Sequence, residues 1–205
     1  MSEEEVSEGW SLTTLSQIGV WCSGGTPSRK IASYYSDGDI PWVKSGDLTD
    51  GLLVATEERI SKSGLENSSA KLLPAGTVSI AMYGATIGKS SVLGIDAATN
   101  QACANCQVTG NLIDAWFLFY YLLSQREGFI AAGQGGAQPN ISATILKEWP
   151  LVLAPLPEQH RIVEKVEALL AEVKAARERL AKVPLILKRF RQAVLAAACA
   201  RASAV

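Results

Sequence analysis

A regular apolar pattern occupies the last quarter of the chain and leaves few ways to fold it. An apolar residue or alanine recurs there at alternating spacings of four and three residues, at Ile162, Val166, Leu169, Val173, Ala176, Leu180, Val183, Leu187, Phe190, Val194 and Ala197. Sustained for about five heptads, this pattern predicts a coiled-coil helix rather than a helix packed on its own domain. The predicted rod is roughly 60 Å long. Its apolar stripe needs a partner, either a second copy or another protein.

Pro184 lies inside this repeat. Because proline removes a backbone hydrogen bond and clashes with the preceding turn, we predict a kink, or a break into two helices, near 181–184. The heptad phase continues across the proline, so both segments are expected to present the same seam. The candidate dimerisation residues are Val166, Leu169, Val173, Leu180, Val183, Leu187, Phe190 and Val194.

The charge of the chain changes where this pattern begins. Residues 156–205 hold ten of the 19 Lys and Arg residues but only five of the 20 acidic residues. The formal net charge of −1 gives no argument from bulk charge for nucleic-acid or membrane binding. We predict an α+β chain in four parts: a solvated acidic tail over 1–9, a globular mixed α/β domain over 10–155, the coiled-coil helix over 156–200 and a short tail over 201–205.

Residues 76–91 predict a β-turn-β unit. In GTVSIAM (76–82), Val78, Ile80 and Met82 alternate with smaller residues, which indicates a half-buried strand. The following YGATIGKSS resembles a phosphate-binding P-loop, but its two glycines enclose three residues where that loop needs four. We therefore interpret it as a turn before a second strand over 91–95, with both glycines at positive φ.

Two further segments of the globular part have a clear local signal. DIPWVKSGDL (39–48) predicts a short strand with flanking turns. LIDAWFLFYYLLSQREGFIAAG (112–133) predicts one helix that ends at a glycine, with its aromatic residues in the core rather than forming a stacking platform.

Catalytic and metal-binding patterns are missing from the sequence. There is a single histidine, His160, no G-x-S-x-G elbow, no methyltransferase motif and no glycine-rich cofactor loop after a strand. The pair Cys103 and Cys106 lacks a second pair of zinc ligands, and we expect all four cysteines, Cys22, Cys103, Cys106 and Cys199, to be reduced core thiols. The N-terminus has no signal-peptide pattern and no run reaches the roughly 18 apolar residues of a membrane span, so we expect a cytoplasmic protein.

Polar loops between the strands carry the candidate binding residues. They are Thr26, Ser28, Arg29 and Lys30 in SGGTPSRK, Lys44 after the strand over 39–48, Thr86, Lys89 and Ser90 in the turn over 83–91, and Gln138 and Asn140 in GQGGAQPNIS. Arg and Lys suit guanine, Asn and Gln suit adenine, and hydroxyls suit phosphates or bases. Ordinary turn chemistry explains the same composition, so the residues alone leave both readings open.

Seven segments, taken in chain order, resemble one family, the DNA specificity subunits of type I restriction–modification systems. They are GGTPSR (24–29), GDIPWVKSGDL (38–48), AKLLPAGTVSIAMYGATIGKSS (70–91), TNQAC (99–103), GGAQPNIS (135–142), PLPEQHRIV (155–163) and LKRFRQAVLAAA (187–198). The set runs almost from end to end of the chain in one register.

The resemblance implies a non-catalytic subunit. A globular target recognition domain reads a few base pairs of double-stranded DNA, and a long helix acts as a spacer and docks the methyltransferase subunit. That partner binds S-adenosylmethionine and methylates adenine at N6, and a restriction (motor) subunit cleaves unmethylated DNA. No cofactor is expected on this chain.

The chain departs from the family's usual pattern of two recognition domains and two helices. It has no second GGTPS and no second PLPEQ, so we expect half a specificity subunit that dimerises through its helix and reads an interrupted palindrome. The alternative is a coiled-coil assembly protein whose globular head binds protein. An enzyme that uses Cys103 and Cys106 is the weakest reading.

Overall fold

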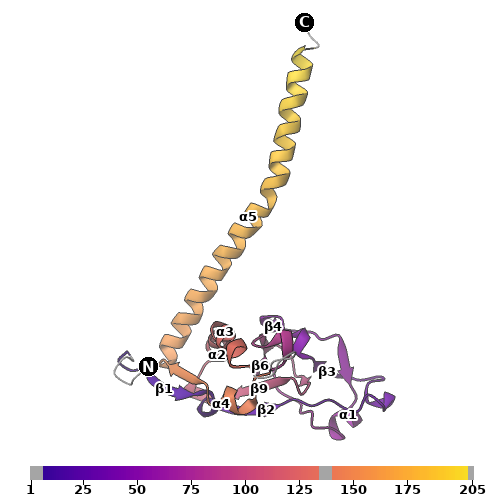
Figure 1. Ribbon diagram of the computed structural model, residues 1–205, viewed down its shortest axis with the longest axis vertical. Coiled ribbons are helices and arrows are strands. Elements are labelled where there is room, and N and C mark those ends of the chain that lie inside the picture. Colours follow the sequence, from indigo (N-terminus) through magenta and orange to yellow (C-terminus); the bar gives the residue numbers. More distant parts are fainter. Residues whose placement is uncertain (1–6, 134–139, 203–205) are drawn as a thin grey trace. The chain divides into compact units, whose positions relative to one another are not determined.

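The computed structural model describes residues 7–133 and 140–202, which form two compact units, Met1–Arg161 and Ile162–Val205. Unit 1 is built from short strands and short helices, and unit 2 is a single helix (Figure 1). An α+β fold with a long C-terminal helix is therefore confirmed.

The main sheet of unit 1 joins segments that are far apart in the sequence. Its five strands lie in the order β2 (Gly19–Ser23), β9 (Cys103–Val108), β6 (Val78–Ala81), β7 (Ser90–Leu93) and β4 (Gly51–Leu53). All neighbours are antiparallel except β4 and β7, which are parallel. Leu53, Leu73, Leu93 and Cys103 belong to the buried cluster beside this sheet.

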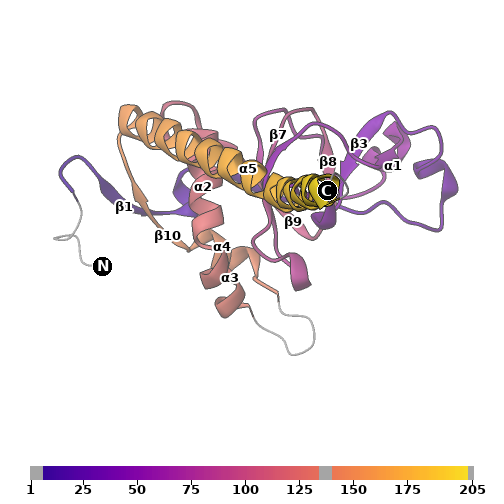
Figure 2. The same ribbon diagram turned by 90° about the horizontal axis from the view of Figure 1, so that it is seen from above.

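Two smaller sheets complete unit 1. One has the order β5 (Glu58–Ile60), β3 (Ile40–Val43) and β8 (Ala98–Thr99). The other pairs β1 (Ser11–Thr14) with β10 (Pro150–Leu153), which lie side by side in Figure 2. Because β1 is the first strand and β10 the last, their pairing ties the two ends of unit 1 together.

Short helices connect these strands. The α-helices of unit 1 are α1 (Lys62–Glu66), α2 (Ala115–Ser124), α3 (Arg126–Ala132) and α4 (Ala143–Lys147). Single 3₁₀ turns are η2 (Leu15–Gln17), η3 (Ala32–Tyr34), η4 (Ser45–Asp47), η5 (Gly84–Thr86) and η6 (Gly110–Leu112). The strand and turn predicted over 39–48 are thus present as β3 and η4.

The predicted β-turn-β unit is confirmed as the antiparallel pair β6–β7, joined by η5. Gly84 and Gly88 have φ of +61° and +78°, as the turn interpretation requires. The half-buried character predicted for the first strand is wrong, since all four residues of β6 are buried. Ser79 is tolerated there because its hydroxyl donates to Asn105 Oδ1 at 2.8 Å.

The single helix predicted over 112–133 is also wrong, because the chain forms α2 and α3. Asp114 caps α2 by accepting hydrogen bonds from the backbone N–H groups of Trp116 and Phe117 at 2.9 and 3.0 Å. At Gln125 the backbone leaves helical geometry, with φ −90° and ψ 1°. The core placement of the aromatic residues holds for Phe117 and Phe119, which are buried.

Cys103 and Cys106 are buried free thiols, as predicted, whereas the free thiol Cys22 is only partly buried and so is not the core residue that was expected. Burial raises the pKa of each thiol to about 12, so both stay protonated at neutral pH. Within residues 7–133 and 140–202, no three His, Cys, Asp or Glu side chains gather closely enough to hold a metal ion.

Helix α5 (Leu156–Ala202) runs unbroken through Pro184, so the chain forms one helix there rather than two. Its ribbon bends part-way along its length (Figure 1). In the described part of the chain, no helix is long and apolar enough to cross a membrane.

The first residues of α5 belong to unit 1, and the side chain of Gln159 attaches them to the rest of that unit by hydrogen bonds. Its buried side chain accepts a hydrogen bond from the Asp114 N–H at 2.8 Å and donates to the carbonyls of Leu112 and Ala154 at 3.0 and 2.7 Å. All three partners are backbone groups, so this one glutamine links the segment 112–114 and the end of β10 to the start of α5.

Candidate nucleic-acid interface

Two of the predicted cations meet at one carboxylate. Arg29 Nη2 lies 2.7 Å from Glu58 Oε2, and Lys44 Nζ lies 2.9 Å from Glu58 Oε1. Arg29 follows β2, Lys44 follows β3 and Glu58 opens β5. We call these three residues the Glu58 cluster.

Two aromatic rings pack against the guanidinium group of Arg29. Its guanidinium carbon lies 4.2 Å from the centre of the Tyr35 ring and 5.1 Å from that of Trp42. Both rings are themselves anchored, because Trp42 Nε1 donates to the Gly25 carbonyl at 3.0 Å and Tyr35 Oη donates to the Pro27 carbonyl at 2.6 Å. The guanidinium is therefore held by an ion pair and by cation–π contacts together.

The ion pairs shift the pKa values of their members. The hydrogen bond from Lys44 is the main cause that lowers the pKa of Glu58, and the same bond raises the pKa of Lys44. Both cations stay accessible, with 54% of the Arg29 side chain and 31% of the Lys44 side chain exposed. The cluster is thus a charged and preorganised surface group.

The two glycines of GGTPSR explain how the loop reaches this position. The Gly24 N–H donates to the Cys103 carbonyl at 3.1 Å and the Gly25 N–H to the Thr99 carbonyl at 2.8 Å. A Cβ atom at either glycine would collide with backbone atoms of the neighbouring segments. Glycine is therefore required for the close approach that seats the loop on the sheet.

The remaining predicted residues of this loop lie at the surface. Thr26, Ser28 and Lys30 are exposed. The Thr26 hydroxyl donates to Gln101 Oε1, which joins this loop to the turn between β8 and β9.

A second group forms at the β6–β7 turn. The backbones of Tyr83 and Asn140 form a β-bridge, and the Thr86 hydroxyl donates to the Tyr83 carbonyl at 2.8 Å. Thr86, Lys89 and Asn140 are therefore brought together, with Asn140 exposed and the other two half-buried.

Arg126 supports this turn, and the sequence analysis missed it. Its guanidinium donates to the Gly88 carbonyl at 3.1 and 3.2 Å and pairs with Asp50 at 2.5 Å. The sequence did hold a local signal for a surface role here. Four consecutive polar residues interrupt the apolar pattern at 124–127, and one continuous core-facing helix would turn some of them toward the core.

Ser90 leaves the set of predicted DNA-binding residues. Ser90 is fully buried, and its hydroxyl donates to the Gly88 carbonyl at 3.2 Å, so its side chain cannot contact DNA. Gln138 lies outside the described residues. The two groups of predicted residues that remain are the one around the Glu58 cluster and the one at the β6–β7 turn. They are connected by the segment 44–50, because Lys44 begins it and Asp50, the partner of Arg126, ends it.

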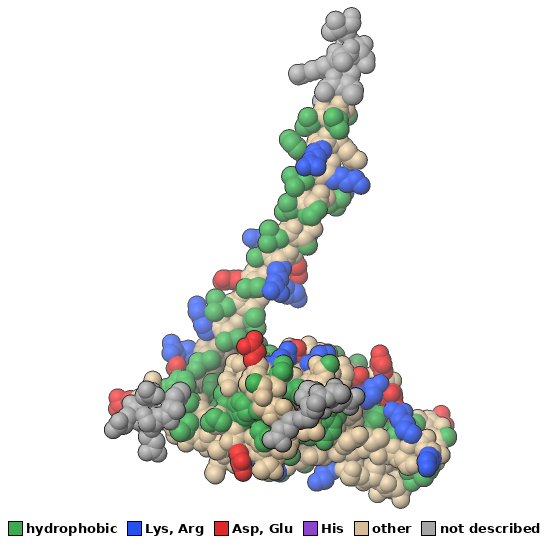
Figure 3. Space-filling view, viewed as in Figure 1, with side chains coloured by type: hydrophobic (Ala, Val, Ile, Leu, Met, Phe, Trp, Pro, Cys, Tyr) green, Lys and Arg blue, Asp and Glu red, His purple; other side chains and the backbone are tan. Residues whose placement is uncertain are grey.

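Charged side chains of both signs are interspersed on the face of unit 1 seen in Figure 3. The same figure shows apolar side chains along α5. Seven of the eight predicted dimerisation residues are exposed and Val166 is half-buried. Four exposed apolar residues of α5 lie off the predicted seam, namely Leu170, Leu185, Ile186 and Leu195.

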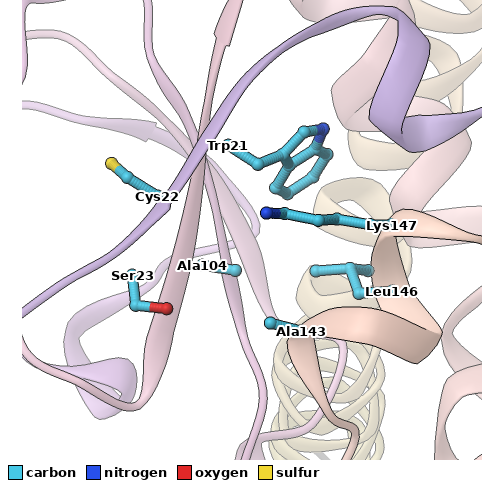
Figure 4. A pocket seen from close by; sticks show the side chains of 7 residues that line it. All are labelled: Trp21, Cys22, Ser23, Ala104, Ala143, Leu146 and Lys147. Carbon is cyan, nitrogen blue, oxygen red and sulfur yellow. The ribbon is translucent and has the colours of Figure 1, made fainter.

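A cavity of about 70 Å³ lies between β2, β9 and α4. Figure 4 shows the Lys147 side chain extending across it below the Trp21 ring, while the Cys22 side chain points away. This volume holds about two water molecules.

Comparison with known families decides the classification. The family described as "Type I restriction modification DNA specificity domain" matches residues 7–185. The chain belongs to this family. The match includes the Glu58 cluster, the β6–β7 turn and most of α5.

Curated specificity subunits show the same relationship. The chain is 30% identical over 208 residues to the type I restriction enzyme EcoKI specificity subunit of Escherichia coli strain K12, an alignment that covers 97% of this chain and 44% of that subunit. It is 29% identical over 157 residues to the EcoR124I/EcoR124II specificity subunit of Escherichia coli, covering 74% of this chain and 38% of that subunit. The chain thus spans less than half the length of either relative.

The fold agrees with a solved structure of this class. The HsdS subunit from Thermoanaerobacter tengcongensis superposes with a TM-score of 0.65 at 22% identity, covering 83% of this chain and 40% of that one. At this identity the likeness shows the fold.

Proposed function

We propose that this chain is a non-catalytic, sequence-specific DNA-binding subunit of a type I restriction–modification complex in the cytoplasm. The observation that carries the proposal is the family match over residues 7–185. A methyltransferase subunit supplies S-adenosylmethionine and transfers the methyl group to adenine N6, and a restriction subunit acts on unmethylated DNA. The chain itself then needs no cofactor.

The DNA-reading face comprises the two groups that flank residues 44–50. Arg29, Lys30, Lys44 and Lys89 supply cations for phosphates and guanine edges. Thr26, Ser28, Thr86 and Asn140 supply hydroxyl and amide groups for phosphates and adenine. Because the proposed DNA-contacting side chains lie in two loops, they are suited to contact several successive base pairs.

Helix α5 makes the chain a two-fold homodimer in this proposal. One helix with an exposed apolar stripe fits an antiparallel pairing, because a two-fold axis lets the same surface cover itself. The axis passes near Leu180, and Val166 of one copy lies close to Val194 of the other. The two recognition domains then read the same half-site on opposite strands, so the target is an interrupted palindrome.

Selection from random duplex DNA tests the proposal. The purified chain is expected to enrich one short motif, and affinity should fall steeply with salt. Alanine at Arg29 is expected to cost about 1–3 kcal/mol and to relax one position of the motif. Methyl transfer is expected only after addition of a methyltransferase subunit. Absence of any sequence preference, or methylation by the chain alone, would contradict the proposal.

A further inference from the structure

We propose that Glu58 is a specificity-determining positioning residue, which weakens the attraction of Arg29 and Lys44 to DNA phosphates and directs the free donors of Arg29 toward a guanine. This inference rests on the proposed function and assigns a role to a residue that carries the wrong charge for binding DNA.

The geometry of Glu58 is the first support. One carboxylate oxygen is used by Arg29 and the other by Lys44, so a single side chain engages both cations. Its backbone is fixed by the β3–β5 ladder, where Glu58 lies opposite Trp42, and by the Thr56 hydroxyl, which donates to the Glu58 carbonyl at 2.7 Å. The Glu58 carboxylate is therefore attached to a strand whose backbone is held in place.

The orientation of Arg29 is the second support. A guanidinium has five N–H donors in a planar fork, and Glu58 engages Nη2. The Tyr35 and Trp42 rings restrict the plane of the group. Because more than half of the Arg29 side chain is exposed, the free donors can reach the two acceptors, O6 and N7, that guanine presents in the major groove.

The charge balance explains why Glu58 should act on specificity rather than on affinity. Two cations and one carboxylate leave the cluster with a single net positive charge. Unpaired Arg and Lys side chains bind any phosphate, whatever the sequence. Pairing with Glu58 weakens that general attraction while it holds Arg29 in the one orientation that suits a base edge.

Glu58→Gln tests the inference, and Glu57→Gln is its matched control. The Glu57 side chain is 86% exposed and lies 3.9 Å from Lys44, so both variants remove one negative charge at neighbouring positions. For Glu58→Gln we expect binding to random duplex DNA about three- to tenfold tighter, with a log–log salt slope steeper by about 1. We also expect the preference at one G·C position to fall at least about fivefold, consistent with the discrimination that a bidentate contact gives.

Glu57→Gln is expected to tighten random binding slightly and to keep the G·C preference. Arg29→Lys keeps the charge but loses the fork, so it should lose the same preference with an unchanged salt slope. Because Arg29→Lys removes the contact through which Glu58 would act, a retained G·C preference overturns the inference even if Glu58→Gln does not fold.

The outcomes separate the inference from the proposed function. If the wild-type chain prefers one motif and Glu58→Gln behaves like Glu57→Gln, or Arg29→Lys keeps the G·C preference, the inference is wrong and the proposed function stands. If the wild-type chain shows no sequence preference, the proposed function fails and the inference fails with it.

Discussion

The interior of unit 1 and the surface of α5 distribute polar and apolar side chains in opposite ways. Asn105, in the middle of the main sheet, is fully buried. Its side-chain oxygen and nitrogen are both still hydrogen-bonded, by accepting from the Ser79 hydroxyl at 2.8 Å and donating to Thr99 Oγ1 at 2.8 Å and to the Cys22 carbonyl at 3.3 Å. On α5, by contrast, Leu180 is 68% exposed and Phe190 is 65% exposed.

The difference shows which region is complete by itself. Among the described residues, every buried side-chain nitrogen and oxygen of the protein has a hydrogen-bond partner, so unit 1 satisfies its own interior. Among the described residues of α5 beyond Arg161, most of the large apolar side chains are exposed. Since most helical stability in proteins comes from packing of an apolar face, we expect the helix to depend on association in a way that unit 1 does not.

The largest expected effect follows from Leu180→Glu. In the proposed dimer this change brings two carboxylates together at the two-fold axis, where burial of each unpaired charge costs several kcal/mol. Dimerisation should weaken at least about 100-fold, while unit 1 stays folded. Analytical ultracentrifugation at micromolar concentration measures this.

Ala181→Glu is the control, because it places the same charge one residue away and off the seam. It should remain dimeric. A monomeric wild type, or a Leu180→Glu variant that still dimerises, would show that the stripe is covered in another way.

A smaller effect is expected from replacing a buried glutamine. Gln159→Leu has a similar volume but leaves three backbone groups of unit 1 without their partner. Unfolding should become easier by about 2–4 kcal/mol, because each unsatisfied buried group costs about 1–3 kcal/mol. Urea titration followed by tryptophan fluorescence reports on unit 1.

Gln192→Leu makes the identical substitution on the exposed part of the same helix. It should stay within about 0.5 kcal/mol of wild type. If the two substitutions lower the free energy of unfolding equally, the buried glutamine of unit 1 is no more important for stability than an exposed glutamine of α5.

The smallest effect concerns the thiols of unit 1. Because burial raises the pKa values of Cys103 and Cys106 to about 12, almost no reactive thiolate forms at pH 8. Iodoacetamide should leave both unmodified in the native protein and should modify both in urea, as peptide mass spectrometry can measure. Cys22 is only partly buried and should react before them. Rapid native modification of Cys103 would mean that the sheet opens far more readily than its packing indicates.

Much of the candidate site could be located from the sequence, but its internal organisation could not. The loops that carry Arg29 and Lys89 were identifiable because glycines mark turns wherever they occur. Nothing local indicated that Glu58 would pair with Arg29 and Lys44, since the contact depends on the pairing of β5 with β3. Ser90 was misplaced for a related reason, because burial on β7 depends on the neighbouring strands.

The sequence by itself determined the features that arise from near neighbours in the chain. The helix over 156–202 and its apolar seam follow from a heptad spacing that any helix converts into one face, and the β6–β7 turn follows from glycines that permit positive φ. Tertiary structure alone decided the full burial of β6 and the joining of two cations at Glu58. These features depend on which distant segments pack together. The side chains that meet in this way are far apart in the sequence, at spacings that follow no helix or strand period.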